Sequence, residues 1–535
     1  MKFETLTLGC VLKTVSHEHS NKTAIIFEDN QLSYAHMFKH SKNLALSFKK
    51  MGIQKDDKVA IILPNCLEYM YIYFALFMIG AWAVPMSTRW EEEELNNVLK
   101  DSESTTVIYK NRIGILSYSD IFSHIKDDLP LLKNYILLEN DVPETRHSLN
   151  EMIYCEFKDI GPDHILNQSH VAPDDVALLA YTSGTTGRPK GVMISHKTLV
   201  LTSYHTQKIW GTGHEVAFSV APLYAAQGFL AVLIDLVAGV TMKWHLNFNP
   251  HDILLELAKG DINTFHTQPT MWSLLLMQPY ITASAFSHLN KVIVSGSLCS
   301  PALAKRIEQN MGCTLLNAYG LIEATGVVTL THPDDPDDIR LNTVGRPIPG
   351  VEIKIVDVHT RQELKNGGIG ELAVRGYLMK GYYRNDTKTS EVIDENGWLY
   401  TGDLACVHDG LNIKIMGRCK DMIIRGGFNV YPTDIEECLI QLDAIEDVSV
   451  VGRPDDLLGE SIVAFVIPNP GESLSQGDVK RFCRGKISNY KIPDEVIFVS
   501  QFPILLSGKV QKNILKDWAE NDVPDDCRMM FEFIQ

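Results

Sequence analysis

Residues 181–191 read Y-T-S-G-T-T-G-R-P-K-G and gather several groups that bind phosphate. Glycines let the backbone turn sharply and approach a ligand closely. Successive N–H groups in such a turn form a concavity that binds anions. Hydroxyl groups add neutral donors, and one lysine adds a positive charge. The stretch therefore predicts a polyphosphate site, with the following candidate ligands: Thr182, Ser183, Gly184, Thr185, Thr186 and Lys190.

The flanking residues indicate where this loop lies. Residues 175–181 read as a buried strand, and a helix is expected from about Ser195, whose hydroxyl can cap it. We therefore expect the loop between a strand and a helix, a usual place for phosphate. It is not a Walker A loop, because Lys190 is followed by Gly191 and not by Ser or Thr. A flexible linker is the alternative, but linkers seldom carry Pro-Lys-Gly between two apolar strands.

The loop resembles, without a mismatch, the signature loop of the adenylate-forming superfamily. That superfamily includes acyl-CoA synthetases, the adenylation domains of peptide synthetases, and luciferases. The resemblance implies that the polyphosphate belongs to ATP and that a carboxylic acid is activated as its adenylate. It also implies Mg²⁺ and coenzyme A as further cofactors. The match is specific in itself, and the family's other motifs follow in order along the chain.

The second motif is Asn317-Ala-Tyr-Gly-Leu-Ile-Glu323, which follows a short apolar strand at 314–316. An aromatic ring beside a glycine can lie flat against a purine, and a carboxylate can hold Mg²⁺. Alone, a core tyrosine and a surface glutamate explain the pattern equally well. It resembles the family's Tyr-Gly-x-Thr-Glu motif, which implies a catalytic, metal-binding Glu323. The same resemblance implies adenine contacts from Asn317, Ala318, Tyr319 and Gly320.

This motif departs from the family at Ile322. The family's threonine contacts the α-phosphate, and isoleucine has no hydroxyl to do so. We expect water, Thr325 or a loop hydroxyl to substitute, with weaker adenylation as the cost. A smaller departure is Leu505, which stands where the family usually has a threonine.

Two further motifs concern the ribose and the hinge. An acidic residue after a strand, such as Asp403 in Tyr-Thr-Gly-Asp, can accept both ribose hydroxyls, although turn aspartates are common. Residues 417–432 resemble the segment that joins the family's large and small domains; a basic hairpin is the alternative. The resemblance implies that Arg418 bridges ribose and phosphate and that Lys420 is the hinge. It assigns the coenzyme A arm to Gly426 and Gly427.

Near the C-terminus, Leu506-Ser-Gly-Lys509 matches the family's last motif. The resemblance implies that Lys509 is catalytic and bridges the carboxylate and the α-phosphate. A lone lysine in a Ser-Gly turn is usually only solvated. Its place after Phe502-Pro503 and before Lys512 favours the catalytic role.

The acyl pocket is encoded less clearly. By resemblance it is lined by residues 222–228, 266–271 and 295–299, and the candidates within these segments are Tyr224, Ala225, Gln227, Gly228, Ser295, Gly296 and Ser297. These segments are small and apolar, with no cation for a second carboxylate. Asp235 is the nearest acidic candidate for an amino group, but residues 230–237 read as a core helix. A fatty or aryl acid is therefore expected rather than an amino acid.

Length and composition limit the remaining choices. The chain has 535 residues, enough for two or more domains, and its net charge of −17 argues against nucleic acid as a partner. The ten cysteines form no C-x-x-C pair, which is typical of free thiols in a reducing cytoplasm. The longest apolar run, residues 71–85, is shorter than the ~20 residues of a membrane span. It predicts a buried helix and a strand, and peripheral membrane contact stays open.

Alternating strand and helix patterns predict an α/β fold. We expect a large N-terminal domain of stacked mixed sheets over residues 1–417, with a small β-barrel-like subdomain at about 342–417. A hinge is expected at 418–420 and a smaller mobile α+β lid domain at 421–535.

The leading hypothesis is a cytoplasmic acyl-CoA synthetase that acts on a hydrophobic acid with ATP, Mg²⁺ and coenzyme A. An acyl-adenylate ligase serving a carrier protein or an amine is the second hypothesis. A catalytically weak binding relative is the third, because Ile322 and Leu505 depart from the family. No carrier motif follows Lys509, which argues against a built-in peptide-synthetase role.

Overall fold

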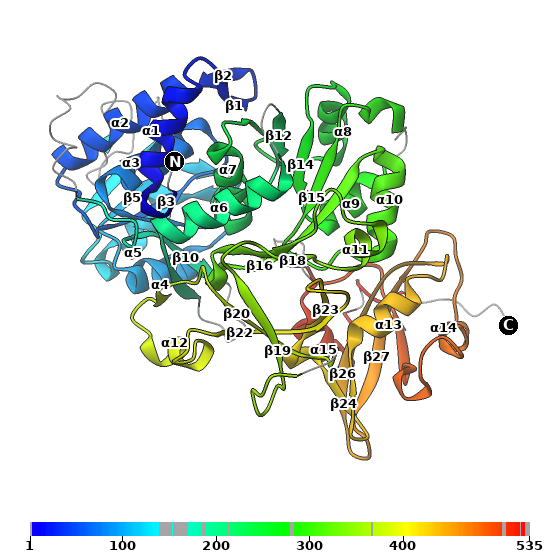
Figure 1. The fold of residues 1–535 in the computed structure, drawn as a ribbon. Helices are drawn as coiled ribbons and strands as arrows, with labels where there is room; N and C mark the ends of the chain where they lie inside the picture. The colour runs from blue at the N-terminus through cyan, green and yellow to red at the C-terminus, as the bar shows by residue number, and fades with distance from the viewer. Residues whose placement is uncertain are drawn as a thin grey trace.

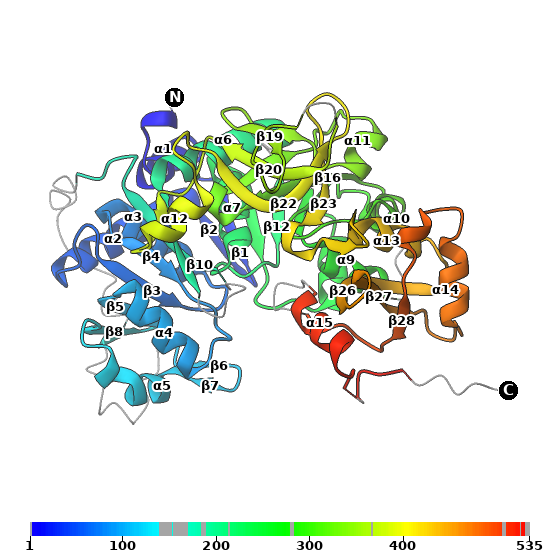
Figure 2. The same cartoon turned by 90° about the horizontal axis from the view of Figure 1, so that it is seen from below.

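Two large mixed sheets, with helices between and around them, form most of the molecule (Figure 1). This computed structural model describes residues 3–138, 152–153, 170–182, 189–211, 215–278, 283–364, 367–504, 510–524 and 526–529. A smaller four-stranded sheet lies beside the large ones, and a separate five-stranded sheet forms the C-terminal unit (Figure 2). The expected mixed α/β architecture is confirmed.

The first large sheet has nine strands and is parallel from β16 to β1, with antiparallel strands at both edges. Its order is β18 (Arg346–Pro347), β17 (Gly326–Leu330), β16 (Thr314–Leu321), β15 (Lys291–Val294), β14 (Thr264–Thr267), β12 (Val216–Ser219), β13 (Thr241–Trp244), β1 (Thr23–Phe27) and β2 (Asn30–Ser33). One face is covered by α8 (Pro250–Ala258), α9 (Pro269–Leu276) and α10 (Pro301–Met311).

The second large sheet has eight strands. Its order is β21 (Gly381–Tyr382), β11 (Lys190–Ser195), β10 (Val176–Thr182), β4 (Trp82–Pro85), β3 (Lys58–Ile62), β5 (Thr106–Tyr109), β8 (Asn134–Leu137) and β9 (Met152–Ile153). The pairs from β10 to β9 are parallel, whereas β10–β11 and β11–β21 are antiparallel. Its outer face packs against α4 (Glu92–Ser102) and α5 (Tyr118–Ile125).

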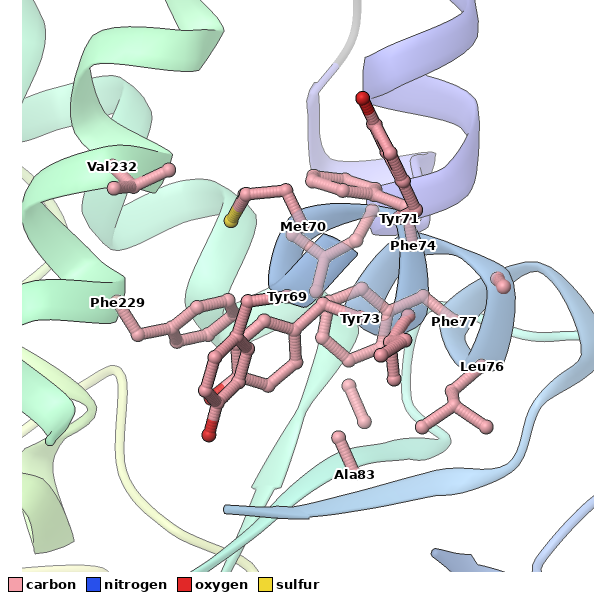
Figure 3. Packing of buried hydrophobic residues seen from close by; sticks show 14 of the residues in the cluster. Tyr69, Met70, Tyr71, Tyr73, Phe74, Leu76, Phe77, Ala83, Phe229 and Val232 are labelled. Atoms are coloured by element: carbon pink, nitrogen blue, oxygen red, sulfur yellow. The ribbon is translucent and has the colours of Figure 1, made fainter. Parts of the chain in front are cut away.

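One hydrophobic core joins the two large sheets. It combines side chains of both sheets with α1 (Leu8–Glu18), α2 (Tyr34–Lys50), α3 (Leu67–Ile79), α6 (His196–Trp210) and α7 (Ala226–Val237). Ten of the thirteen residues of α3 are buried, as expected of a helix that is apolar all round. From α3, Tyr69, Met70 and Tyr73 point toward Phe229 and Val232 of α7 (Figure 3). The ring centres of Tyr73 and Phe229 lie 4.5 Å apart, so aromatic packing fixes one helix on the other.

The expected β-rich subdomain is an antiparallel sheet of four strands. Its order is β19 (Glu352–Val356), β20 (Gly370–Arg375), β22 (Leu399–Val407) and β23 (Ile413–Arg418). The short helices α11 (Asp337–Asn342) and α12 (Asp386–Val392) lie in this part of the chain. A 3₁₀ turn, η7 (Cys419–Asp421), follows β23 at the position assigned to the hinge.

The C-terminal unit has its own sheet and its own core. The strands are β24 (Ile423–Arg425), β25 (Phe428–Val430), β26 (Ile445–Asp455), β27 (Gly459–Pro468) and β28 (Glu495–Phe498). The helices are α13 (Pro432–Leu439), α14 (Gln476–Cys483) and α15 (Lys512–Glu520). Two buried clusters, one on α13 and α14 and one on α15, cover the sheet.

The structure corrects several expectations about local structure. The phosphate loop does not lead from a strand to a helix, because residues 190–195 form β11 and pair antiparallel with β10. The loop therefore joins two strands of one hairpin, and the helix capped by Ser195 begins only after β11. Asn317 and Asp403 do not follow strands but lie within β16 and β22.

In the C-terminal unit, α13 has Pro432 at its first position and Tyr431 as N-cap, an arrangement that suits the fixed φ of proline.

Among the described residues, no helix is both long enough and apolar enough to cross a bilayer. The nine cysteines that the structure describes are free thiols. The cytoplasmic location expected from them stays a prediction.

His196, the first residue of α6, gives the fold a pH dependence. Its side chain is fully buried, its Nδ1 accepts the N–H of Leu8 at 3.4 Å, and its ring meets Phe77 edge-on. Burial lowers the pKa of His196 from 6.5 to about 4; nearby Asp175 opposes this shift and Lys55 adds to it. The folded state therefore requires the neutral imidazole, whereas the unfolded chain takes up a proton below about pH 6.5.

We predict that His196 alone removes roughly 3 kcal/mol of stability as the pH falls from 6.5 to 4. His196→Asn keeps an acceptor for Leu8 but does not titrate. Thermal unfolding followed by circular dichroism across this pH range should show a shallower fall in midpoint for the variant. Parallel curves for the two proteins would show that His196 does not contribute.

Candidate active site

Lys190, Tyr382 and Glu323 lie together where the two large sheets meet. The Lys190 ammonium lies 5.1 Å from the centre of the Tyr382 ring. The Tyr382 hydroxyl donates to Oε1 of Glu323 at 3.0 Å. Lys190 starts β11 and Tyr382 is on β21, which pairs with β11 between Val192 and Tyr382. The phosphate-loop lysine and the candidate metal-binding carboxylate are therefore joined through one tyrosine.

The position of Glu323 follows from the turn at the end of β16. Glu323 lies in η6 (Ile322–Ala324), between β16 and β17. A Cβ on Gly320 would lie 1.6 Å from the carbonyl oxygen of Gly326, so the close pairing of these strands requires glycine there. The carbonyl of Glu323 also accepts the N–H of Met379 at 2.7 Å, just before β21.

Tyr319, Asp403 and Arg418 form a second cluster. The Tyr319 hydroxyl donates to Oδ2 of Asp403 at 2.7 Å, and Nε of Arg418 lies 3.3 Å from Oδ1. Burial, followed by the charge of Asp403, raises the pKa of Tyr319, so this hydroxyl stays protonated and donates. The residues assigned to adenine and ribose are thus neighbours, although they come from β16, β22 and β23.

Glu371 of β20 holds the backbone of the Thr-Gly-Asp segment, residues 401–403, by a hydrogen bond. Its Oε1 accepts the N–H of Gly402 at 2.8 Å, and burial raises the pKa of its carboxyl. The hydroxyl of Thr401 donates to the carbonyl of Leu372 and accepts the N–H of Asp403. Asp403 is therefore held in place by the strand that runs beside it.

Asn317 has a structural partner for its side-chain amide. Its Nδ2 donates to the carbonyl of Arg340 in α11 at 2.8 Å, and its side chain is buried. Asn317 and Ala318 also line a crevice together with Ser297. Ser297, assigned to the acyl pocket, therefore lies beside the segment assigned to adenine.

The other acyl-pocket candidates meet at the carboxyl edge of the nine-stranded sheet. Nε2 of Gln227 donates to Oγ of Ser295 at 2.9 Å, and Gly296 has a left-handed φ of 88°. Gly228 is required by close packing, because an added Cβ would lie 2.2 Å from the carbonyl oxygen of Pro222. Half-buried Tyr224 and Ala225 precede α7, with Ala225 as its N-cap residue.

The hinge and coenzyme A candidates are exposed. Lys420 lies in η7, and its carbonyl accepts from Nζ of Lys516 in α15 at 3.4 Å. Gly426 and Gly427 have φ values of 55° and 82° and form the turn between β24 and β25. A two-residue hairpin turn with both φ values positive favours glycine by itself, so their role toward coenzyme A stays a prediction.

Several assigned residues lie outside the described residues. They are Ser183, Gly184, Thr185, Thr186 and Lys509, together with Leu505. For Thr182 the structure gives only its backbone place at the end of β10. The site therefore rests on Lys190, Glu323, Tyr319, Asp403 and Arg418.

Ile322 stands where the family has a threonine, and Thr325 is a candidate to replace the lost hydroxyl. Ile322 is half-buried and packs against the large core. Thr325, one of three substitutes considered for the lost hydroxyl, has a φ of 55° and a fully buried side chain. Thr325 therefore does not reach the surface of the site, which leaves water or a loop hydroxyl.

Sequence reasoning missed Tyr382 and Glu371, and it placed Gln268 only within the pocket segment 266–271, without a role of its own. Tyr382 stands beside Gly381, and this Gly-Tyr pair on a short strand was the available signal. Glu371 alternates with apolar residues in β20, which by itself indicates a solvent-facing position rather than a buried one. Gln268 precedes the Pro-Thr-Met that begins α9 and donates to Oε1 of Gln227 at 2.5 Å.

The residues present fit a magnesium ion shared with phosphate. Within the described part of the chain, no group of three or more His, Cys, Asp or Glu residues could hold a metal. Glu323 would supply one carboxylate, and phosphate oxygens and water would complete the octahedral shell that Mg²⁺ requires. When bound, the ion would neutralise phosphate charge.

Comparison with known proteins identifies the family. Residues 12–383 match the family described as "AMP-binding enzyme", and residues 434–509 match "AMP-binding enzyme C-terminal domain". The chain belongs to the AMP-binding enzyme family. The candidate nucleotide residues Lys190, Tyr319 and Glu323 fall inside the first match, and Lys509 ends the second.

Relatives extend over the full length of the chain. A Bacillus subtilis protein with the provisional name acyl-CoA synthetase YngI is 34% identical, covering 96% of both chains. The mitochondrial medium-chain acyl-CoA ligase ACSF2 of Rattus norvegicus is 29% identical, covering 96% of this chain and 88% of its own. Among solved structures, ATP-bound MatB from Rhodopseudomonas palustris is 27% identical with a TM-score of 0.86, covering 96% and 99% of the two chains.

We predict that Tyr382→Phe lowers kcat/KM for ATP in the adenylation half-reaction by at least ~10-fold. The variant keeps the ring beneath Lys190 but removes a hydrogen bond to a charged carboxylate, typically worth about 1.5 kcal/mol or more. ATP–pyrophosphate exchange at varied ATP concentration measures the effect.

Tyr383→Phe is the matched control, because its hydroxyl donates to Glu103 at 2.8 Å, away from Glu323. It should leave exchange nearly unchanged. Equal losses in the two variants would show that Tyr382 acts only on folding.

Proposed function

We propose that this enzyme is an AMP-forming acyl-CoA synthetase that acts on a hydrophobic carboxylic acid. It joins the acid to the AMP part of ATP, releases pyrophosphate, and then transfers the acyl group to the thiol of coenzyme A. The observation that carries the proposal is the meeting of Lys190, Tyr382 and Glu323 beside the Tyr319–Asp403–Arg418 cluster. The names of the full-length relatives support the same activity.

The first half-reaction brings two anions together, because a carboxylate oxygen must attack the α-phosphate. A carboxylate is also a poor electrophile until its oxygen becomes a good leaving group. Fixed positive charge placed where negative charge develops lowers this barrier. In the proposal, Lys190 and the loop donors hold the departing pyrophosphate, Glu323 holds Mg²⁺, and Lys509 bridges the two reacting anions.

The nucleotide is held by the second cluster. Asp403 accepts the ribose hydroxyls, Arg418 bridges ribose and phosphate, and Tyr319 lies against the adenine. In the present structure Tyr319 and Arg418 already engage the oxygens of Asp403, and a carboxylate oxygen can accept a further hydrogen bond from a ribose hydroxyl. Arg418 is half-exposed and is the last residue before the turn that contains Lys420.

In the second half-reaction, rotation at Lys420 removes Lys509 and presents Gly426 and Gly427 to the incoming thiol. The exposed turn at Gly426 and Gly427 supports this role, since an added Cβ at Gly427 would meet no described atom within 4 Å. Closing one site at a time also limits hydrolysis of the anhydride. The large domain is proposed to end at residue 417 and the mobile lid to begin at 421.

Two other functions are kept for testing. A ligase that passes the acyl group to a carrier protein or an amine would form the same adenylate but no acyl-CoA. A binding relative without catalysis is favoured only by the departures at Ile322 and Leu505.

Incubation with a panel of acids, ATP, Mg²⁺ and coenzyme A, read by mass spectrometry, tests the proposal. AMP without acyl-CoA would favour the ligase, and no AMP at all would leave only binding.

We predict that Lys509→Ala slows the first half-reaction much more than the second. Carboxylate-dependent pyrophosphate exchange should fall by at least ~10²-fold, the usual scale for one removed electrostatic stabiliser. Thioester formation from supplied acyl-adenylate should fall much less. Exchange and single-turnover thioester assays on the same preparation measure both.

Lys388→Ala is the control, because this lysine pairs with Glu391 on the exposed face of α12. It should leave both half-reactions unchanged. Equal losses in both half-reactions of Lys509→Ala would contradict the role assigned to Lys509.

A further inference from the structure

Three polar side chains form a hydrogen-bonded chain in the proposed acyl pocket. Gln268 donates from Nε2 to Oε1 of Gln227 at 2.5 Å. Gln227 donates from Nε2 to Oγ of Ser295 at 2.9 Å and to the carbonyl of Thr267 at 3.2 Å. We call Gln268, Gln227 and Ser295 the polar ladder.

The polar ladder joins three elements at the carboxyl edge of the nine-stranded sheet. Gln268 follows β14, Ser295 follows β15, and Gln227 lies in the first turn of α7. Parallel strands neighbouring at β14 and β15 bring their carboxyl ends together, which is where open α/β sheets bind ligands. The polar ladder therefore lies at the edge of the sheet where a ligand is expected.

The side chain of Gln227 occupies the space that a side chain at position 296 would fill, and residue 296 is a glycine. Its φ is 88°, and an added Cβ would lie 2.9 Å from Oε1 of Gln227. The side-chain amide of Gln227 thus lies directly over the backbone of Gly296. All three ladder side chains are half-buried, so they remain accessible to a ligand.

The ladder has unused hydrogen-bonding capacity at both ends. Gln227 uses its amide nitrogen and its carbonyl oxygen within the ladder. Among the described contacts, Oε1 and the second amide N–H of Gln268 have no partner, and the Ser295 hydroxyl accepts from Gln227 without donating to another group. Gln268 also does not cap α9 with its side chain. A ligand hydroxyl could accept from Ser295 or donate to Gln268.

We propose, on the basis of the proposed function, that the preferred acid carries a hydroxyl group on its apolar chain or ring. Unpartnered amide and hydroxyl groups in a pocket disfavour plain hydrocarbon, because binding it removes their water without replacing the hydrogen bonds. A hydroxylated acid replaces those bonds. The polar ladder therefore determines specificity within an otherwise apolar pocket.

The test compares each parent acid with its hydroxylated isomers. Octanoate and benzoate are the parents, and their 2-, 3- and 4-hydroxylated forms, with ω-hydroxyoctanoate, are the partners. ATP–pyrophosphate exchange gives kcat/KM for each. For wild type we expect one hydroxylated isomer to exceed its parent by at least ~10-fold, since sites built to bind a hydroxyl reject the analogue that lacks it.

Ser295→Ala and Gln268→Leu should lower this ratio to about one or below, each by removing a ladder end. The ratio compares two substrates within one preparation, so it does not depend on the fraction of variant that folds. Gln31→Leu, on the edge strand β2 at the far side of the sheet, is the control and should keep the wild-type ratio.

The possible failures are distinguishable. If no acid yields exchange, the proposed function is wrong and not only this inference. If the parent acids react as well as every hydroxylated isomer, or if both ladder variants keep the wild-type ratio, the polar ladder is only a structural link between α7 and the two strands.

Discussion

Two hydrogen bonds, each from a different tyrosine to a different carboxylate, join three sheets at the candidate site. Tyr382 of the eight-stranded sheet donates to Glu323, which lies in the turn between β16 and β17 of the nine-stranded sheet. Tyr319 of β16 donates to Asp403 of the four-stranded sheet. Neither bond lies within one sheet, so the site exists only where the sheets are packed correctly. Its geometry therefore depends on the shared core of α1, α2, α3, α6 and α7, which also contains Tyr382.

The C-terminal unit is attached to the rest by contacts of a different kind. Lys414 of β23 pairs with Glu437 of α13 at 2.9 Å, and both side chains are about a quarter exposed. Lys516 reaches the carbonyl of Lys420 at the hinge position. Partly solvated ion pairs contribute little free energy, whereas the unit's own core is fully buried. These contacts agree with the rotation proposed for this unit.

Local patterns predicted most of the elements but few of the contacts. The apolar run at 71–85 predicted α3 and β4 because a helix buried on all sides must be apolar all round. An apolar strand was recognised on each side of the phosphate loop, but the antiparallel pairing of β10 with β11 was not foreseen. The second partner of β11 is β21, nearly two hundred residues later, and such pairing leaves no periodic signal near residue 190. Tyr382 and Glu371 were missed for the same reason, since both act on residues from other strands.

The substrate pocket shows the limit of reasoning from side-chain type alone. Asp235 was read as a core residue, and the structure places its carboxylate 3.1 Å from Nε2 of buried His266. A carboxylate already paired with a buried imidazole would leave that partner unsatisfied if it turned to an amino group, which is costly. This pairing argues against an amino-acid substrate. The surrounding sequence reads as apolar and small, yet Gln227 and Gln268 are paired there through space, a property that neither residue shows in the sequence.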